Sequence, residues 1–147
     1  MKTIFDQTTR DQLIRRIDVL NENSKAQWGK MNVYQMLKHC TLAEDLYLGN
    51  TPHKRMFLGY IFGKWALKNI LKDGAMRRNA PTSDRFIVVE PSGDLEAVKK
   101  KWMAQLEEYA NYTTVDFIHW FFGRMTKEQI GQLVYIHADH HLQQFNA

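Results

Sequence analysis

Hydrophobic residues recur at helical spacing along most of the chain, and five segments have the pattern of a helix. The predicted helices span 9–21, 33–48, 56–72, 95–111 and 126–145. The first has a narrow apolar stripe with charged residues outside it, as on a surface helix. The second is apolar over a wide arc, which is typical of a helix packed inside a bundle.

Two of these helices begin with the pattern of a capping box. Asn32 precedes Gln35 by three residues, and Thr126 precedes Gln129 in the same way. In such a box the first side chain accepts from a free backbone N–H, and the glutamine accepts from the N–H of the capping residue. Both starts are therefore well defined by the sequence.

The connections between helices indicate the topology. Residues 77–94 lack helical periodicity, and "RFIVVE" within them has β propensity but no partner strand, so we expect an extended loop. The connection from 33–48 to 95–111 is long and contains the 56–72 helix, whereas the flanking connections are short. This pattern predicts an all-α fold, a four-helix bundle with a long crossover between helices 2 and 3 that contains an extra helix.

Length and composition fit one domain over residues 1–147. The single cysteine excludes an internal disulfide framework and favours a reducing compartment. "MKTIFDQTTR" lacks the apolar run of a signal peptide. The longest apolar stretch is interrupted by Lys64 and Lys68 and is shorter than the ~20 residues of a spanning helix. We therefore expect a cytoplasmic protein without stable membrane insertion.

The formal net charge of +4 does not by itself indicate a nucleic-acid partner. Basic residues gather between Lys54 and Arg78, but no motif with base-reading spacing accompanies them. A solvated basic face is the simpler interpretation, and nucleic-acid binding is not predicted.

The last helix places histidines where core residues are expected. At ~100° per residue, His137 and His141 lie in the middle of its apolar face, His140 on the flank and Asp139 on the opposite side. Imidazoles at i and i+4 present their nitrogens to one point, which is a common way to hold a metal. A pair of hydrogen-bonded core histidines is the alternative. A zinc-protease H-E-x-x-H motif is excluded because Ala138 replaces the glutamate.

A catalytic zinc commonly has three protein ligands, so a third residue is needed. The candidates are His39, Cys40, His53 and His119. His39 lies at the margin of the apolar arc of the 33–48 helix, where a polar residue needs a reason. Cys40 is turned ~100° from it and cannot easily bind the same ion. We therefore favour His39.

"WGKMNVYQMLKHC" and "FGRMTKEQIGQLVYIHADHHLQQF" resemble the N-terminal half and the last helix of the DinB/YfiT-like superfamily. The second resembles an uncharacterised branch, a domain of unknown function whose members often end in H-x-x-H-H-L-x-Q-F. The resemblance extends from the first helix to the end, except for residues 51–91. It implies a four-helix bundle that holds a divalent metal, Zn or Ni, through His39, His137 and His141.

The resemblance also implies a reaction class, because members of the superfamily include thiol-dependent S-transferases and isomerases. A small-molecule substrate or a low-molecular-weight thiol is therefore expected, with hydrolysis as the other option. Glu44 is the candidate base for hydrolysis, and a partly exposed ion-pair partner is its alternative role. His119 and Trp120 are candidate substrate-binding residues. His119 could instead pack on Trp120, where the branch often has proline.

A different hypothesis is a non-catalytic interaction module. The "RMFLGYIFGKW" run of the 56–72 helix would dock a partner, a second copy or an anionic membrane surface. Its apolar residues lie nearly all round the helix, which favours burial in the domain or in a homodimer interface. Gly59 and Gly63 in the same helix form a small-xxx-small pair that allows a close contact.

Overall fold

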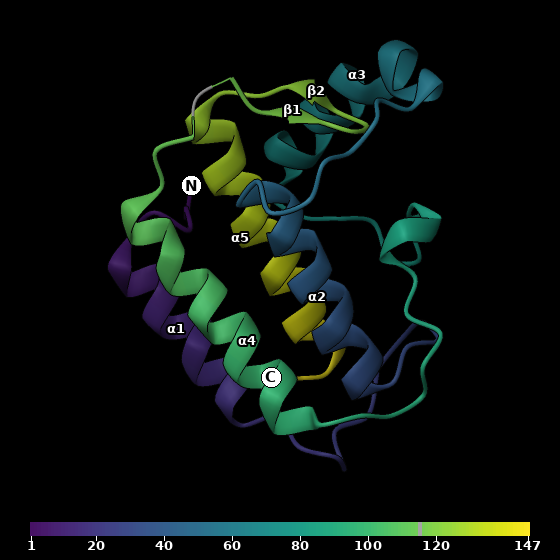
Figure 1. Ribbon diagram of the computed structural model, residues 1–147, viewed down its shortest axis with the longest axis vertical. Coiled ribbons are helices and arrows are strands. Elements are labelled where there is room, and N and C mark those ends of the chain that lie inside the picture. Colours follow the sequence, from purple (N-terminus) through teal and green to yellow (C-terminus); the bar gives the residue numbers. More distant parts are fainter. Residues whose placement is uncertain (115) are drawn as a thin grey trace.

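The structure is a computed structural model that describes residues 1–114 and 116–147, and most of its regular structure is helical (Figure 1). In this described part the α-helices are α1 (Gln7–Asp18), α2 (Val33–Tyr47), α3 (Phe57–Asp73), α4 (Leu95–Glu108) and α5 (Lys127–Gln144). Two short 3-10 helices, η1 (Asp84–Phe86) and η2 (Tyr109–Asn111), and an antiparallel pair of strands, β1 (Ile118–His119) and β2 (Gly123–Arg124), complete it. The prediction of an all-α fold is therefore confirmed in its main part.

The starts of α2, α4 and α5 follow the capping signals of the sequence, whereas α1 has no side-chain cap and lies two to three residues before its predicted bounds. The side chains of Asn32 and Thr126 accept from the backbone N–H groups three residues on, and both capping boxes are complete. Asp94 caps α4, and Gly74 ends α3 in the left-handed conformation that glycine adopts without strain. The predicted 95–111 helix is divided, because α4 continues as the 3-10 turn η2.

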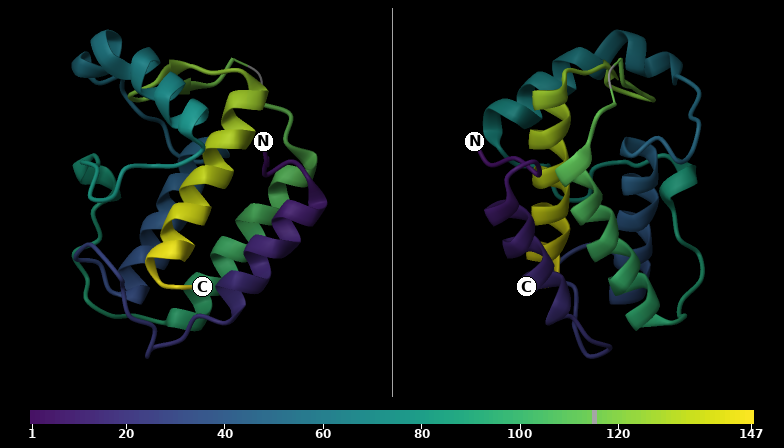
Figure 2. Two further views of the ribbon diagram at one scale, coloured as in Figure 1. Left: turned by 180° about the vertical axis from the view of Figure 1, so that it is seen from behind. Right: turned by 60° about the vertical axis from the view of Figure 1, so that its left-hand side comes forward.

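Four of the helices surround a shared hydrophobic core. α2 packs against α4 and α5, and α1 packs against the same two helices from the other side (Figure 2). Each contributes the apolar stripe predicted from its sequence. Among the fully buried side chains are Leu13, Ile17, Met36, Leu37, Trp102, Leu106, Ile130 and Leu133. The packing of α2 on α5 is the contact that matters for the chemistry described below.

α3 lies at the edge of this core, to which it contributes Leu67, at the end of the molecule that also carries β1 and β2 (Figure 1). Its buried face includes Gly59 and Gly63, and a Cβ added at either position would overlap the carbonyl oxygen of Phe121 in the turn between the strands. The predicted close contact is thus present, although its partner is a turn rather than a helix. The outer face of the helix is exposed in the single chain, so full burial within the domain is wrong, while burial in a homodimer interface stays a prediction.

Gly63→Ala should lower the free energy of unfolding by about 1–3 kcal/mol, because the new methyl group meets backbone atoms of Phe121 and Phe122 that cannot rotate away. Asn69→Ala on the same helix is the control, since it also favours the helix but introduces no such overlap. Urea unfolding of both variants measures the difference. If Gly63→Ala raised the free energy of unfolding as much as Asn69→Ala, the close contact of Gly63 with Phe121 would be contradicted.

Residues 77–94 are largely irregular, as predicted, apart from the turn of η1. The strands β1 and β2 are not predicted from the sequence. Each strand has two residues, which is too short for an alternating pattern to be recognised. Among the described residues, the structure contains no helix with the length and hydropathy required to cross a membrane.

Candidate metal centre

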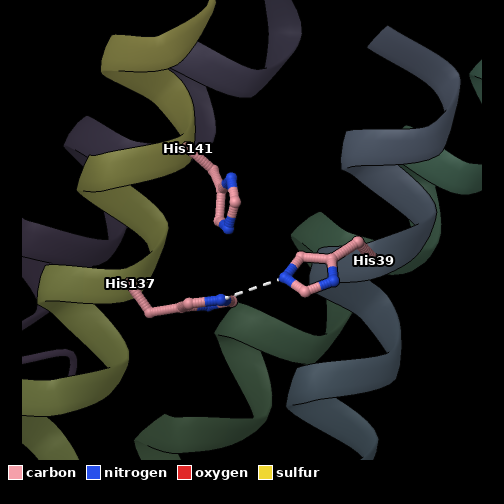
Figure 3. A group of neighbouring side chains, drawn as sticks. All are labelled: His39, His137 and His141. Carbon is pink, nitrogen blue, oxygen red and sulfur yellow. Dashed lines mark hydrogen bonds between the residues drawn. The ribbon is translucent and has the colours of Figure 1, made fainter. Parts of the chain in front are cut away.

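Three histidines from two helices meet between α2 and α5 (Figure 3). His39 projects from α2 toward His137 and His141 of α5, and one ring nitrogen of each lies within 4.8 Å of the other two. The Nε2 atoms of His39 and His137 are 3.3 Å apart. Two nitrogens bound tetrahedrally to one zinc ion at its usual bond length are separated by about 3.3 Å. The spacing of this pair therefore already suits a shared ion.

The local sequence explains how the three side chains come together. His137 and His141 are separated by one helical turn and share a face of α5. His39 lies on the side of α2 that packs against α5. The structure thus brings together the three histidines that the sequence predicted as ligands, while the binding of a metal by them stays a prediction.

Two of the imidazoles are oriented by hydrogen bonds at their outer nitrogens. Nδ1 of His39 donates to the carbonyl oxygen of Phe86 at 2.8 Å, and Nδ1 of His141 donates to Oε1 of Gln144 at 2.9 Å. Gln144 is itself fixed, because its Nε2 donates to the carbonyl oxygen of Trp28 at 2.8 Å. With the proton on Nδ1, Nε2 of each ring keeps its lone pair for a metal.

Burial keeps these imidazoles in the neutral form. Loss of hydration lowers the pKa of His39, lowers that of His141 to about 3, and lowers that of His137 well below its ordinary value. The neighbouring imidazoles strengthen the effect on His137 and His141. Among the described residues, no carboxylate contributes to these three pKa shifts. A cation bound here would keep its full charge and would favour an anionic fourth ligand.

Glu44 of α2 is buried in the core, where its carboxylate contacts α4 and η2. Its carboxylate accepts from Tyr109 Oη at 2.5 Å and from Trp102 Nε1 at 3.4 Å, and both donors come from the α4–η2 segment. The side chain is 1% exposed, so the interpretation as a partly exposed ion-pair partner is wrong. Burial raises the pKa of Glu44 to about 7, although the two hydrogen bonds act in the opposite direction. Its role as a base stays a prediction.

His119 and Trp120 lie in a cluster of aromatic side chains around β1. Nδ1 of His119 accepts from the backbone N–H groups of Phe121 and Phe122, both at 3.1 Å, and its ring stacks on that of Phe122. The ring centroids of His119 and Trp120 are 5.3 Å apart, so the expected packing contact is present. Burial is the main reason that the pKa of His119 is lowered to about 3. Substrate binding by this pair stays a prediction.

The segment 137–141, "HADHH", contains two further polar residues, His140 and Asp139, which lie on different sides of α5. His140 sits edge-on to the ring of Trp28, with centroids 5.6 Å apart, which agrees with the predicted flank position. Asp139 lies on the side of α5 opposite the histidines, as predicted, but it is not free in solvent. It forms an ion pair with Arg16 of α1 at 2.6 Å, because α1 packs against the side of α5 that faces away from the histidines.

The orienting residues Phe86 and Gln144 were not predicted from the sequence. Gln144 gives one signal, since it follows His141 by three residues and therefore shares its helix face. Phe86 gives none, because its backbone carbonyl is the group that binds His39.

Comparison with known proteins places the chain in a family. A search of curated proteins and a search of solved structures gave no match. A family model described as "Protein of unknown function (DUF1569)" matches residues 2–147, nearly the whole chain, and the protein therefore belongs to the DUF1569 family.

Proposed function

We propose that the protein is a divalent-metal-dependent enzyme of the DinB/YfiT-like superfamily, with Zn²⁺ or Ni²⁺ held by His39, His137 and His141. The observation that carries this proposal is the convergence of three ring nitrogens within 4.8 Å of one another. The packing of α1 and α2 against the same two helices, α4 and α5, and the long α2–α4 connection support a four-helix bundle of the expected kind.

A divalent ion held by three neutral imidazoles supplies a Lewis acid that lowers the pKa of a thiol or water bound in its remaining position. The protein's own contribution is to present the three ligands in the neutral form. Phe86 and Gln144 fix the rings of His39 and His141, so the ligands need little reorientation when an ion binds.

The surroundings of the histidines favour thiol transfer over hydrolysis. Hydrolysis requires a base near the attacking water. Glu44, the candidate base, is hydrogen-bonded to Tyr109 and Trp102, and its charge acts on the pKa of Cys40, Tyr47 and Tyr109 rather than on those of the histidines. A low-molecular-weight thiol needs no such base once its pKa is lowered, and as an anion it complements the cation.

Elemental analysis of protein purified without a histidine tag tests the proposal. We expect about one Zn²⁺ or Ni²⁺ per chain, by analogy with other three-histidine sites. His39→Ala should reduce the metal to background, whereas His53→Ala should not, because His53 lies outside the group of three. The metal-loaded protein should then consume a thiol in a screen of electrophilic substrates, and a chelator should stop the reaction. Absence of metal after incubation with Zn²⁺ would overturn the proposal.

Gln144→Met should weaken zinc affinity by about 10–100-fold, because it removes the acceptor that holds Nδ1 of His141 while preserving the length of the side chain. Gln143→Met is a matched control on the same helix, since Gln143 is exposed and its side chain bonds only to Asp139 among the described residues. Competition with a chromogenic chelator measures both affinities. Equal affinities in the two variants would show that Gln144 does not orient the ligand.

A further inference from the structure

The outer face of α3 exposes six large hydrophobic side chains. We refer to them as the α3 patch, and each is at least 51% exposed: Phe57, Leu58, Tyr60, Ile61, Phe62 and Trp65. The inner face of the helix is occupied, because Gly59, Gly63 and Leu67 are buried there. A soluble monomer rarely leaves so many neighbouring apolar side chains in water unless they form a binding surface.

The positive charge of the protein is concentrated around the same helix. Of the 20 basic and 16 acidic residues of the chain, residues 54–78 contain seven and one, so 13 basic and 15 acidic residues remain elsewhere. The single acid in this segment, Asp73, is the last residue of α3. Lys68 and Lys72 are exposed on the two turns that follow the patch. The segment therefore combines an apolar surface with a local excess of cations.

The α3 patch could be covered by a second copy of the chain or by a membrane surface, and the charge of the segment favours the membrane. A second copy paired about a two-fold axis would set basic residues of one 54–72 segment beside those of the other, and this segment contains no acid to compensate them. A membrane surface that contains anionic phospholipids complements both features. Aromatic side chains such as Tyr60 and Trp65 are favoured at the level of the headgroups, and lysines are attracted to anionic lipid.

We propose that the α3 patch docks the protein on the surface of a bilayer that contains anionic phospholipids. α3 stands at one end of the molecule, beside the strand pair (Figure 1, Figure 2). Ile118 of β1, which is 49% exposed, adds an apolar side chain at this end. The proposal does not depend on the metal centre, because His39, His137 and His141 belong to α2 and α5.

Co-sedimentation of the full-length protein with large vesicles tests the apolar contribution. Binding is expected to phosphatidylcholine vesicles that contain about 30% phosphatidylglycerol and not to pure phosphatidylcholine, and it should weaken at high salt. Ile61→Ser combined with Trp65→Ser should reduce the partition coefficient by at least about tenfold. Ile87→Ser combined with Val89→Ser is the matched control, because these apolar side chains are 52% and 79% exposed and lie outside the patch.

Charge reversal tests the electrostatic contribution. Lys68→Glu with Lys72→Glu should reduce the partition coefficient by roughly a hundredfold or more. Lys30→Glu with Lys100→Glu changes the net charge equally at exposed positions away from α3 and should have much less effect. Lys64 is left unchanged because its ammonium group donates to the carbonyl oxygen of Arg124.

The oligomeric state in solution, measured by light scattering, distinguishes membrane docking from pairing with a second copy of the chain. A monomer that binds anionic vesicles supports the proposal. A dimer that Ile61→Ser dissociates, together with no binding to anionic vesicles, would overturn it and make the patch a dimer interface. Equal vesicle binding by the patch and control variants would also overturn it.

Discussion

Zinc present at about 1,000 times its dissociation constant is expected to raise the free energy of unfolding by about 4 kcal/mol, because the ion binds the folded chain alone. The three ligands are distributed over α2 and α5, and His39 and His137 are 98 positions apart in the sequence. Unfolding separates them and releases the ion. Urea unfolding with zinc and with a chelator measures the difference, and His137→Ala should abolish most of it.

His140→Ala is the control for this experiment. His140 belongs to the same helix turn as the ligands, but its ring packs against Trp28 and it is not one of the three converging histidines. This variant should keep the stabilisation by zinc. If His137→Ala is stabilised by zinc as strongly as His140→Ala, the ion does not bind at the proposed centre.

Glu44→Gln is expected to become progressively more stable than the wild type as the pH rises from about 5 to about 8, by roughly 2.5 kcal/mol in total. Burial raises the pKa of Glu44 from its ordinary 4.5 to about 7. Between these values the folded chain holds a proton that the unfolded chain has lost. The stability due to this carboxyl is therefore complete below pH 4.5 and disappears as the pH rises through about 7. The amide cannot ionise, so the variant avoids the loss.

The difference between variant and wild type should be measured by urea unfolding in the presence of a chelator. The buried histidines act in the opposite direction, because their lowered pKa values favour the folded chain as the pH rises. Their contribution cancels in the difference, since both proteins contain them. Glu108→Gln, at an exposed position of α4, should show no comparable dependence on pH. A difference for Glu44→Gln that stays constant with pH would contradict a raised pKa.

The sequence was sufficient to identify the three converging histidines. Two of them share one face of a helix, which periodicity alone reveals. The position of His39 at the margin of an apolar arc pointed to it as the third, and the motif resemblance implies the same set. The capping boxes at Asn32 and Thr126 fixed the starts of both contributing helices. These are local patterns, and local patterns are what a single sequence records best.

Features that depend on distant contacts were missed. The ion pair of Asp139 requires knowing that α1 packs behind α5 and brings Arg16 there. The sequence also left open whether α3 is buried in the domain or in an interface, because a helix that is apolar all round has no single face to show which side meets the core. The close packing of α3 on Phe121 was not predicted either, because it depends on a turn between two strands that are too short to show a sequence pattern.

The orientation of the histidines has a consequence for how this centre tolerates mutation. The side chains of His39 and Gln144 both donate to backbone carbonyls, those of Phe86 and Trp28. Both carbonyls belong to connections between the α-helices. Every amino acid carries such a carbonyl, so substitutions at these two positions preserve the acceptor as long as the backbone keeps its course. Insertions or deletions near them would displace it. For these two hydrogen bonds, the length and path of the loops therefore matter more than side-chain identity, although the ring of Phe86 is also held by its own burial in the core.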